Sequence, residues 1–172
     1  MLKINQKTPS LTLETTSGST YSLKDSAPDT FTLLVFYRGL HCPKCKEYLE
    51  DLNNLVTDYK EVGVNDVLCI SGDTKDKAKS TTEQWDISNL NIGFELSVDS
   101  MNDWGLYISE AIKDTEPAIF NEPGVFLINR NKELFYAGYN SMPFARPSLN
   151  DLLSAVKFIK DKDYPARGTY AK

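Results

Sequence analysis

The chain has 172 residues, a length that predicts one domain able to form a core without disulfides or metal. Its 41% hydrophobic and 25% charged residues exclude collagen, low-complexity sequence and wholesale disorder. The formal charge is −5 and no basic cluster stands out, which argues against a nucleic-acid-binding protein. We therefore expect one globular domain over residues 1–172, with no nucleic-acid partner.

The sequence also lacks the signals of membrane insertion and export. Its apolar runs are far shorter than the ~20 residues that a membrane-spanning helix needs. The first ten residues do not have the charged start and apolar stretch of a signal peptide. We therefore expect no membrane partner and a cytoplasmic protein.

The first elements are expected before residue 63. Apolar residues alternate on both sides of Gly18, which predicts a small β-hairpin over residues 9–24. The apolar, β-prone run at residues 31–37 is typical of a strand covered on both faces. From Pro43 onward apolar residues recur at helical spacing until Gly63, which predicts a helix of about four turns. Proline is favoured at the first helical position, so Cys42 is expected at the N-cap.

Strands and helices alternate through the rest of the chain. They are expected at residues 66–71 (strand), 74–87 (helix), 94–98 (strand) and 101–108 (helix). Strands at residues 125–128 and 134–139 flank a turn and predict a hairpin that closes the sheet. Ser148 is expected to cap a last helix, and the tail from Asp161 is expected to be loosely held. This order predicts an α/β fold, a three-layer α/β/α sandwich with a mixed central sheet and an N-terminal β-hairpin.

A Cys-Pro-Lys-Cys motif at the start of the first long helix is the most informative feature. A thiol there faces unpaired N–H groups and the positive end of the helix dipole, which favour the reactive thiolate. The nearby side chains of Arg38, His41 and Lys44 are expected to add positive charge. Cys42 and Cys45 are one helical turn apart, so one can attack a disulfide and the other can resolve the mixed disulfide. The motif therefore predicts a redox pair.

Other readings of these cysteines remain open. A closed zinc site needs four ligands, and only His41 and Cys69 are left to complete one, so no metal and no cofactor are expected. Two inert thiols that cap a helix are a second alternative. Cys69 lies in an apolar strand and is expected to be a small core residue. His41 is read as a hydrogen-bonding spacer more often than as a general base.

The residues around the motif carry a family resemblance. Residues 31–49, with YRGLHCPKC at 37–45, resemble the thioredoxin-like superfamily and, within it, peroxiredoxin-like proteins of the AhpC/TSA group (alkyl hydroperoxide reductase and thiol-specific antioxidant). The early hairpin and the EPGVFLI segment at 122–128 are similar to an uncharacterised branch of that group. The resemblance implies a thioredoxin-like fold in which Cys42 attacks and Cys45 resolves.

The thioredoxin pattern implies two further features. Thioredoxin-like proteins keep a cis proline before the strand that faces the redox pair, and Pro123 stands at that position. We therefore expect a cis bond before Pro123 that presents backbone edges to a bound partner. The buried acid that thioredoxins often carry is replaced by Phe36, so proton transfer must use water or another group.

The peroxiredoxin pattern gives the cysteines other roles. It places the peroxide-attacking cysteine at Cys45, puts Cys42 at a threonine position and Arg38 at a proline position, and aligns the usual arginine with Pro123. Three of the four usual peroxidase residues are therefore absent, which predicts slow peroxide cleavage. Three arginines are candidate substitutes that the sequence cannot place: Arg38, Arg146 and Arg167.

Three functions follow from these observations. The first is a thiol-disulfide oxidoreductase with a role in redox homeostasis, in which Cys42 attacks, Cys45 resolves and Pro123 positions the partner. The second is a thiol peroxidase that uses Cys45 on hydrogen peroxide or alkyl hydroperoxides. The third is a redox sensor or binding module with little turnover. The expected partners are a protein or small-molecule disulfide or a peroxide, together with a thiol reductant system; the oligomeric state is left open.

Overall fold

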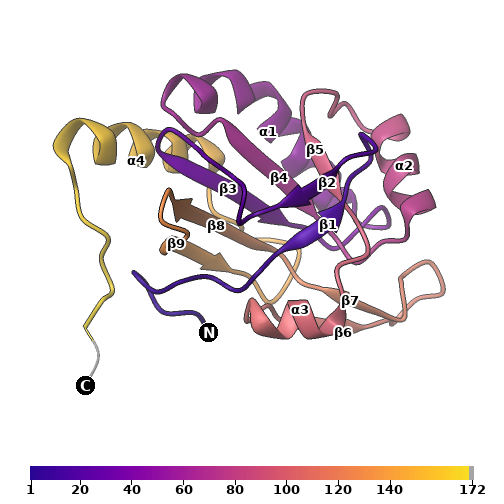
Figure 1. Ribbon diagram of the computed structural model, residues 1–172. Helices are drawn as coiled ribbons and strands as arrows, with labels where there is room; N and C mark the ends of the chain where they lie inside the picture. The colour runs from indigo at the N-terminus through magenta and orange to yellow at the C-terminus, as the bar shows by residue number, and fades with distance from the viewer. Residues whose placement is uncertain (171–172) are drawn as a thin grey trace.

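A mixed five-stranded sheet forms the centre of the computed structural model, which describes residues 1–170 (Figure 1). Its strands, in spatial order, are β5 (Asn91–Gly93), β4 (Asp66–Ile70), β3 (Phe31–Phe36), β8 (Gly124–Asn129) and β9 (Leu134–Tyr139). β3 pairs with β4 in parallel and with β8 antiparallel. The predicted closing hairpin is formed by β8 and β9.

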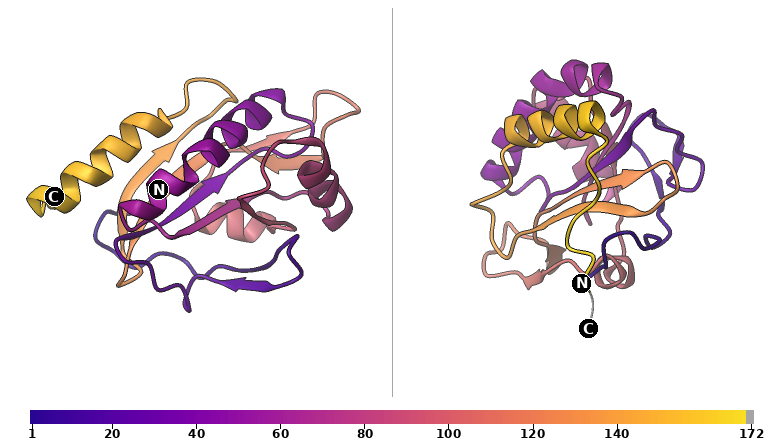
Figure 2. Two further views of the ribbon diagram at one scale, coloured as in Figure 1. Left: turned by 90° about the horizontal axis from the view of Figure 1, so that it is seen from above. Right: turned by 90° about the vertical axis from the view of Figure 1, so that its left-hand side faces the viewer.

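Helices and a hairpin cover the two faces of this sheet. The helices are α1 (Pro43–Glu61), α2 (Lys75–Gln84), α3 (Val98–Asp103) and α4 (Leu149–Lys162). α1 and α4 run side by side over one face, as two views show (Figures 1 and 2). α3 and the N-terminal hairpin of β1 (Thr12–Glu14) and β2 (Thr20–Ser22) contribute to the apolar cluster on the other face. The predicted α/β/α sandwich with its hairpin is therefore confirmed.

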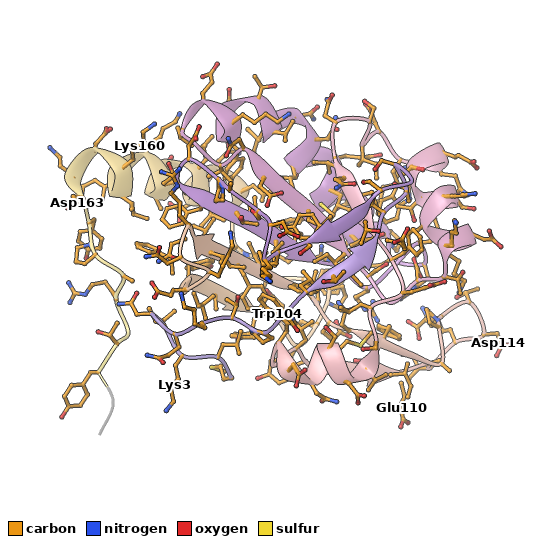
Figure 3. The ribbon with its side chains drawn as sticks, in the orientation of Figure 1. Lys3, Trp104, Glu110, Asp114, Lys160 and Asp163 are labelled. Atoms are coloured by element: carbon orange, nitrogen blue, oxygen red, sulfur yellow. The ribbon has the colours of Figure 1, made fainter. Side chains whose placement is uncertain are left out.

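Strand β3 explains how the sequence builds both layers. All six of its residues are buried. Leu33 and Val35 belong to the apolar cluster under α1 and α4, whereas Leu34 and Phe36 belong to the opposite cluster. That second cluster includes Trp104, labelled in Figure 3, which packs against Phe36. Successive side chains of a strand point to opposite faces, so a strand that is covered on both faces is buried along its whole length and mostly apolar.

The strand predicted at residues 94–98 is wrong. The strand of this region, β5, lies earlier and pairs with β4 through Ile92 and Gly93. Glu95 then has a left-handed backbone with φ of 57°, which interrupts an extended chain. Ser97 caps the next helix by accepting a hydrogen bond from the Ser100 N–H at 3.1 Å. The cap residue, rather than the apolar pattern, sets the start of α3.

The helix predicted at residues 101–108 is also displaced. α3 ends at Asp103, and Gly105 has a φ of 69° that turns the chain. Ile108 belongs instead to β6 (Ile108–Glu110), which pairs with β7 (Ile119–Asn121) in a hairpin that the sequence analysis missed. The connection between these strands carries Asp114 and projects from the molecule in Figure 3. None of the described helices is both long and apolar enough to cross a bilayer.

Candidate active site

The two motif cysteines meet at the N-terminus of α1. Cys42 is the N-cap residue, and its Sγ accepts a hydrogen bond from the Cys45 N–H at 3.2 Å. Pro43 occupies the first turn, where its missing N–H has no consequence. Both cysteines are free thiols and lie almost wholly out of contact with solvent, with exposed fractions of 1% and 0%. The structure therefore brings the sulfurs together, as predicted, but beneath a cover of other side chains.

The two thiols have opposite acidities. A hydrogen bond from the Cys45 thiol lowers the pKa of Cys42 from 9.0 to about 6, against the opposing effect of burial. The Cys45 N–H and the charges of Arg146 and Arg38 lower the pKa of Cys42 further. Burial, together with the neighbouring Cys42, raises the pKa of Cys45 well above its ordinary value. The two shifts are opposite in direction, and the lower pKa of the pair falls on Cys42.

Arg146 supplies the cover on one side. Its Nη2 lies 3.0 Å from Cys45 Sγ and 3.8 Å from Cys42 Sγ. It belongs to residues 140–148, the segment that joins β9 to α4 and that we name the cover loop. Its Nε donates to the Pro143 carbonyl at 3.0 Å. A guanidinium this close stabilises a thiolate by charge and by hydrogen bonding. Sequence spacing gave no signal for the contact, because Arg146 follows Cys45 by 101 residues.

The turn at residues 38–41 forms the opposite side. The Arg38 main-chain N–H donates to Cys45 Sγ at 3.4 Å. The Arg38 guanidinium is held by two carboxylates, with Nη2 3.4 Å from Glu116 Oε1 and Nε 3.3 Å from Glu122 Oε1. The Arg38, Glu116 and Glu122 side chains are only 15%, 8% and 5% exposed, so these ion pairs are shielded from water. The two carboxylates therefore offset most of the effect of the Arg38 charge on the sulfurs.

The remaining candidate arginine is not part of the site. Arg167 lies beyond α4, where its guanidinium stacks 6.0 Å from the Tyr164 ring centre. Of the three arginines, Arg146 brings a side chain to both sulfurs, Arg38 brings a main-chain donor and Arg167 brings neither.

His41 and Lys44 do not behave as expected. The His41 ring packs edge-on against Phe120 with centroids 4.9 Å apart. Burial, and then the charge of Arg38, lower the pKa of His41 to about 4, so it is neutral at pH 7. The expectation that His41 adds positive charge is therefore wrong. The Lys44 ammonium lies 2.6 Å from Glu47 in an exposed ion pair. No described hydrogen bond joins it to a sulfur, so no contact supports its predicted role at the thiolate.

The expected cis bond before Pro123 is also wrong. The described chain contains no cis peptide bond. β7 ends at Asn121 and β8 begins at Gly124, so the chain runs from one strand into the next and needs no cis turn. A trans X-Pro bond is the more stable form by about 0.5–1 kcal/mol. Pro123 still meets the cover loop, because its carbonyl accepts from the Asn140 N–H at 2.9 Å.

A buried acid stands behind the 38–41 turn, and the sequence analysis missed it. Asp73 follows β4 and is 2% exposed. Its Oδ2 accepts from the Leu40 N–H at 2.7 Å, and burial raises its pKa. Gly39 has a φ of 128°, and a Cβ there would lie 2.7 Å from Asp73 Oδ1. A signal was available, because parallel strands end at the same edge of a sheet and Asp73 follows the strand beside β3.

Comparison with known proteins decides the family. The model of the AhpC/TSA family matches residues 4–137. The chain belongs to the AhpC/TSA family. No curated protein matches the sequence. Among the described residues, no group of three or more His, Cys, Asp or Glu side chains is placed to hold a metal ion.

Solved structures show the same fold at low sequence identity. A peroxiredoxin-like protein from Aquifex aeolicus is 20% identical with a TM-score of 0.74, over 92% of this chain and 88% of that one. The peroxidoxin BcpB from Mycobacterium tuberculosis is 17% identical with a TM-score of 0.72, over 92% and 99%. A reduced peroxiredoxin from Vibrio vulnificus in complex with hydrogen peroxide is 15% identical with a TM-score of 0.76, over 91% and 99%. This AhpC/TSA protein therefore has the thioredoxin fold of the peroxiredoxins.

Family membership makes the chain a thiol-dependent antioxidant oxidoreductase. Its own geometry adds what the family assignment does not give. A low-pKa thiol lies beside a thiol that keeps its proton. The cation at these sulfurs comes from the cover loop of this AhpC/TSA protein, rather than from the position that aligns with Pro123.

Proposed function

We propose that this protein is a thiol-disulfide oxidoreductase in which Cys42 attacks and Cys45 resolves. The observation that carries the proposal is the difference in acidity within the pair. The pKa of Cys42 is lowered to about 6, so its thiolate predominates at pH 7, whereas the pKa of Cys45 is raised and its proton is retained.

The reaction balances with two thiols and one disulfide. Cys42 thiolate attacks one sulfur of a substrate disulfide, forms a mixed disulfide and expels the other sulfur as a thiolate. Cys45 then loses its proton and attacks Cys42 Sγ, which releases the second substrate thiol and leaves the Cys42–Cys45 disulfide. The substrate gains two electrons, and the pair loses two. A thiol reductant reverses the same steps on the protein and restores the dithiol.

The surrounding residues support this order of events. The Cys45 N–H and the positive end of α1 stabilise the attacking thiolate, and Arg146 compensates its charge. Because both sulfurs are buried, the substrate must displace Arg146 or the segment that carries it. We assign Pro123 a supporting role through its backbone contact with Asn140.

Single-cysteine variants test the order of attack. Cys45→Ser should accumulate a mixed disulfide on Cys42 when mixed with a disulfide such as insulin, because no resolving thiol remains. Cys42→Ser should form none, because Cys45 is buried and its thiol keeps its proton. Cys69→Ser is the matched control, since Cys69 is buried in β4 and its pKa is raised by burial. Mass spectrometry locates the adducts, and an adduct on Cys45 alone would contradict the proposed order.

Peroxide reduction at Cys45 is the second candidate, and Arg146 favours it. Arg146 Nη2 lies on Cys45 Sγ, and its buried Nη1 has no hydrogen-bond partner among the described residues. An unpaired donor beside the sulfur can hold a peroxide oxygen as its O–O bond breaks. Cys45 thiolate would attack the terminal oxygen of ROOH and break the O–O bond, which gives a sulfenic acid and an alkoxide that takes a proton from water to become ROH. The Cys42 thiol would then condense with the sulfenic acid to give the disulfide and water.

Cys42→Ser separates the two candidates, because it removes the partner that resolves a Cys45 sulfenic acid. If peroxide reduction is the main activity, dilute hydrogen peroxide should convert Cys45 to a sulfenic acid that a dimedone-type probe labels within seconds. If disulfide exchange is the main activity, this label should appear only slowly, while Cys45→Ser still forms mixed disulfides. A wild-type protein inert toward both substrates would favour the low-turnover sensor.

The partners follow from the chemistry of the pair. The substrate is a protein or small-molecule disulfide, or a peroxide, and each turnover oxidises the pair by two electrons. A thiol reductant system must then regenerate the dithiol. We propose the cytoplasm as the compartment, because its thiol pool can supply those electrons.

A further inference from the structure

We propose that Tyr48 and Asn140 are positioning residues that hold Arg146 on the two sulfurs. This inference rests on the proposed function, because it concerns how the low-pKa thiol of Cys42 is maintained. Neither residue makes a hydrogen bond to a sulfur in the described structure. Tyr48, on α1, contacts the Arg146 guanidinium and the backbone after it, and Asn140, just after β9, contacts the backbone before it.

Tyr48 contacts the cover loop through both its ring and its hydroxyl. It lies three residues after Cys45 on α1, and residues at this spacing share one helix face. The Arg146 guanidinium carbon lies 5.1 Å from the centre of the Tyr48 ring, within cation–π range. The Tyr48 hydroxyl donates to the Pro147 carbonyl at 2.8 Å, so the residue after Arg146 is tied to the same side chain. The helix that carries the cysteines therefore also sets the position of their cation.

Asn140 fixes the other end of the cover loop. Its side-chain amide donates to the carbonyls of Phe144 at 3.1 Å and Ala145 at 2.8 Å. Ala145 has a left-handed backbone with φ of 55°, a conformation that is unfavourable for an alanine. Two hydrogen bonds at this site support that turn, which leads the chain into Arg146. The residues just before Arg146 are thus held as well as the residue after it.

Arg146 needs these restraints because no carboxylate holds it. None of the ion pairs among the described residues involves Arg146. Its fixed partners are the Pro143 carbonyl, the Tyr48 ring and the sulfurs themselves. An arginine has several rotatable bonds, so without a restrained backbone it would spend less time on Cys45 Sγ. Loosening Tyr48 or Asn140 should therefore weaken the thiolate without altering either cysteine.

A pair of tyrosines on α1 allows a matched experiment. Tyr48 and Tyr59 each donate a hydroxyl hydrogen bond to a carbonyl at the start of α4, at 2.8 Å to Pro147 and at 2.7 Å to Leu149. Arg146 stacks on the Tyr48 ring. Tyr48→Phe removes the hydroxyl and keeps the ring, Tyr48→Leu removes both, and Tyr59→Phe removes the equivalent bond away from the sulfurs. The readout is the rate of Cys42 alkylation against pH, supported by thiolate absorbance.

The expected result is graded. With a midpoint of about 6 in the wild type, a rise of one in the pKa lowers the alkylation rate at pH 6 about fivefold relative to the plateau rate at high pH. We expect an effect of this size for Arg146→Met, a smaller one for Tyr48→Leu, a smaller one still for Tyr48→Phe and none for Tyr59→Phe. Asn140→Ala, in the cover loop and away from the core, should slow alkylation in the same direction. It keeps the test decisive if Tyr48→Leu fails to fold, which thermal unfolding would reveal.

Arg146→Met is the reference variant that separates the two levels of failure. If Arg146→Met raises the midpoint of the alkylation profile while Tyr48→Leu and Asn140→Ala leave it unchanged, the positioning roles are wrong. If Arg146→Met leaves the midpoint unchanged, Arg146 does not act on the thiol, and the positioning roles fall with it. The proposed function fails by a different result, the absence of mixed disulfides on Cys42 in Cys45→Ser.

Discussion

The two sides of the sulfur site differ in how they use an arginine. On the 38–41 turn, Arg38 is close to the cysteines in sequence, yet its guanidinium is engaged by Glu116 and Glu122. In the cover loop, Arg146 is remote in sequence, yet it lies on Cys45 Sγ at 3.0 Å without a carboxylate partner among the described residues. The comparison teaches that charge near a thiol in sequence does not predict charge at the thiol in space. We propose that Arg38 stabilises the fold and that Arg146 lowers the pKa of the thiol.

The largest expected effect concerns the turn. Arg38→Met leaves the buried Glu122 carboxylate without its counter-charge, and removal of one partner from such a pair costs about 3 kcal/mol of folding stability. Chemical denaturation of the wild type and the variant measures this loss. A second change, Glu122→Gln, should recover part of it, since the uncompensated charge is then gone. If Arg38→Met is as stable as the wild type, the turn is not held by its ion pairs.

An intermediate effect is expected in the cover loop. Arg146→Met should raise the pKa of Cys42, so that the midpoint of the alkylation profile moves up from about 6 by about one. Its unfolding free energy should stay within about 1 kcal/mol of the wild type, because no ion pair is broken. Arg38→Met should move the alkylation profile less, because Arg38 is a smaller cause of the low pKa of Cys42. A larger shift of the alkylation profile in Arg38→Met than in Arg146→Met would contradict these separate roles of the two arginines.

The smallest effect is expected at Asp73. Burial raises the pKa of this carboxyl in the folded protein, so its contribution to stability is fully present at low pH and is lost as pH rises through the raised pKa. Asp73→Asn cannot ionise and keeps an oxygen that accepts from the Leu40 N–H, so its stability should decline less from pH 4 upward. Thermal unfolding across that range tests this, with the exposed Asp114→Asn as the control. An unchanged pH dependence would show that the Asp73 carboxyl is not perturbed.

Much of the fold could be read from the sequence, because local signals and packing agree there. Pro43, the apolar spacing of α1 and Gly63 define a helix by capping and periodicity, and β3 is mostly apolar because both its faces are covered. The hairpin of β6 and β7 escaped, because its strands are only three residues long and show no clear alternation. Short elements of this kind are set by tertiary contacts rather than by pattern.

The site also has features that follow from local sequence and features that depend on tertiary contacts. The pairing of Cys42 and Cys45 follows from a spacing of three on one helix, which any α-helix fixes. Arg146 and Asp73 reach the site from other elements, so only the folded sheet and the cover loop bring them there. The error over His41 arose because its ring packs on Phe120, where burial keeps it neutral. Sequence reasoning named the proposed nucleophile and its partner thiol, but it did not place Arg146 or Asp73 at the site.

One measurement addresses the acidity of Cys42 directly. The rate of alkylation of the wild-type protein is followed from pH 4 to pH 10, and mass spectrometry assigns the modified residue at each pH. The account predicts that Cys42 reacts first, with a midpoint of about 6, and that Cys45 and Cys69 react far more slowly. A midpoint near the ordinary value of 9.0, or preferential labelling of Cys45, would contradict it.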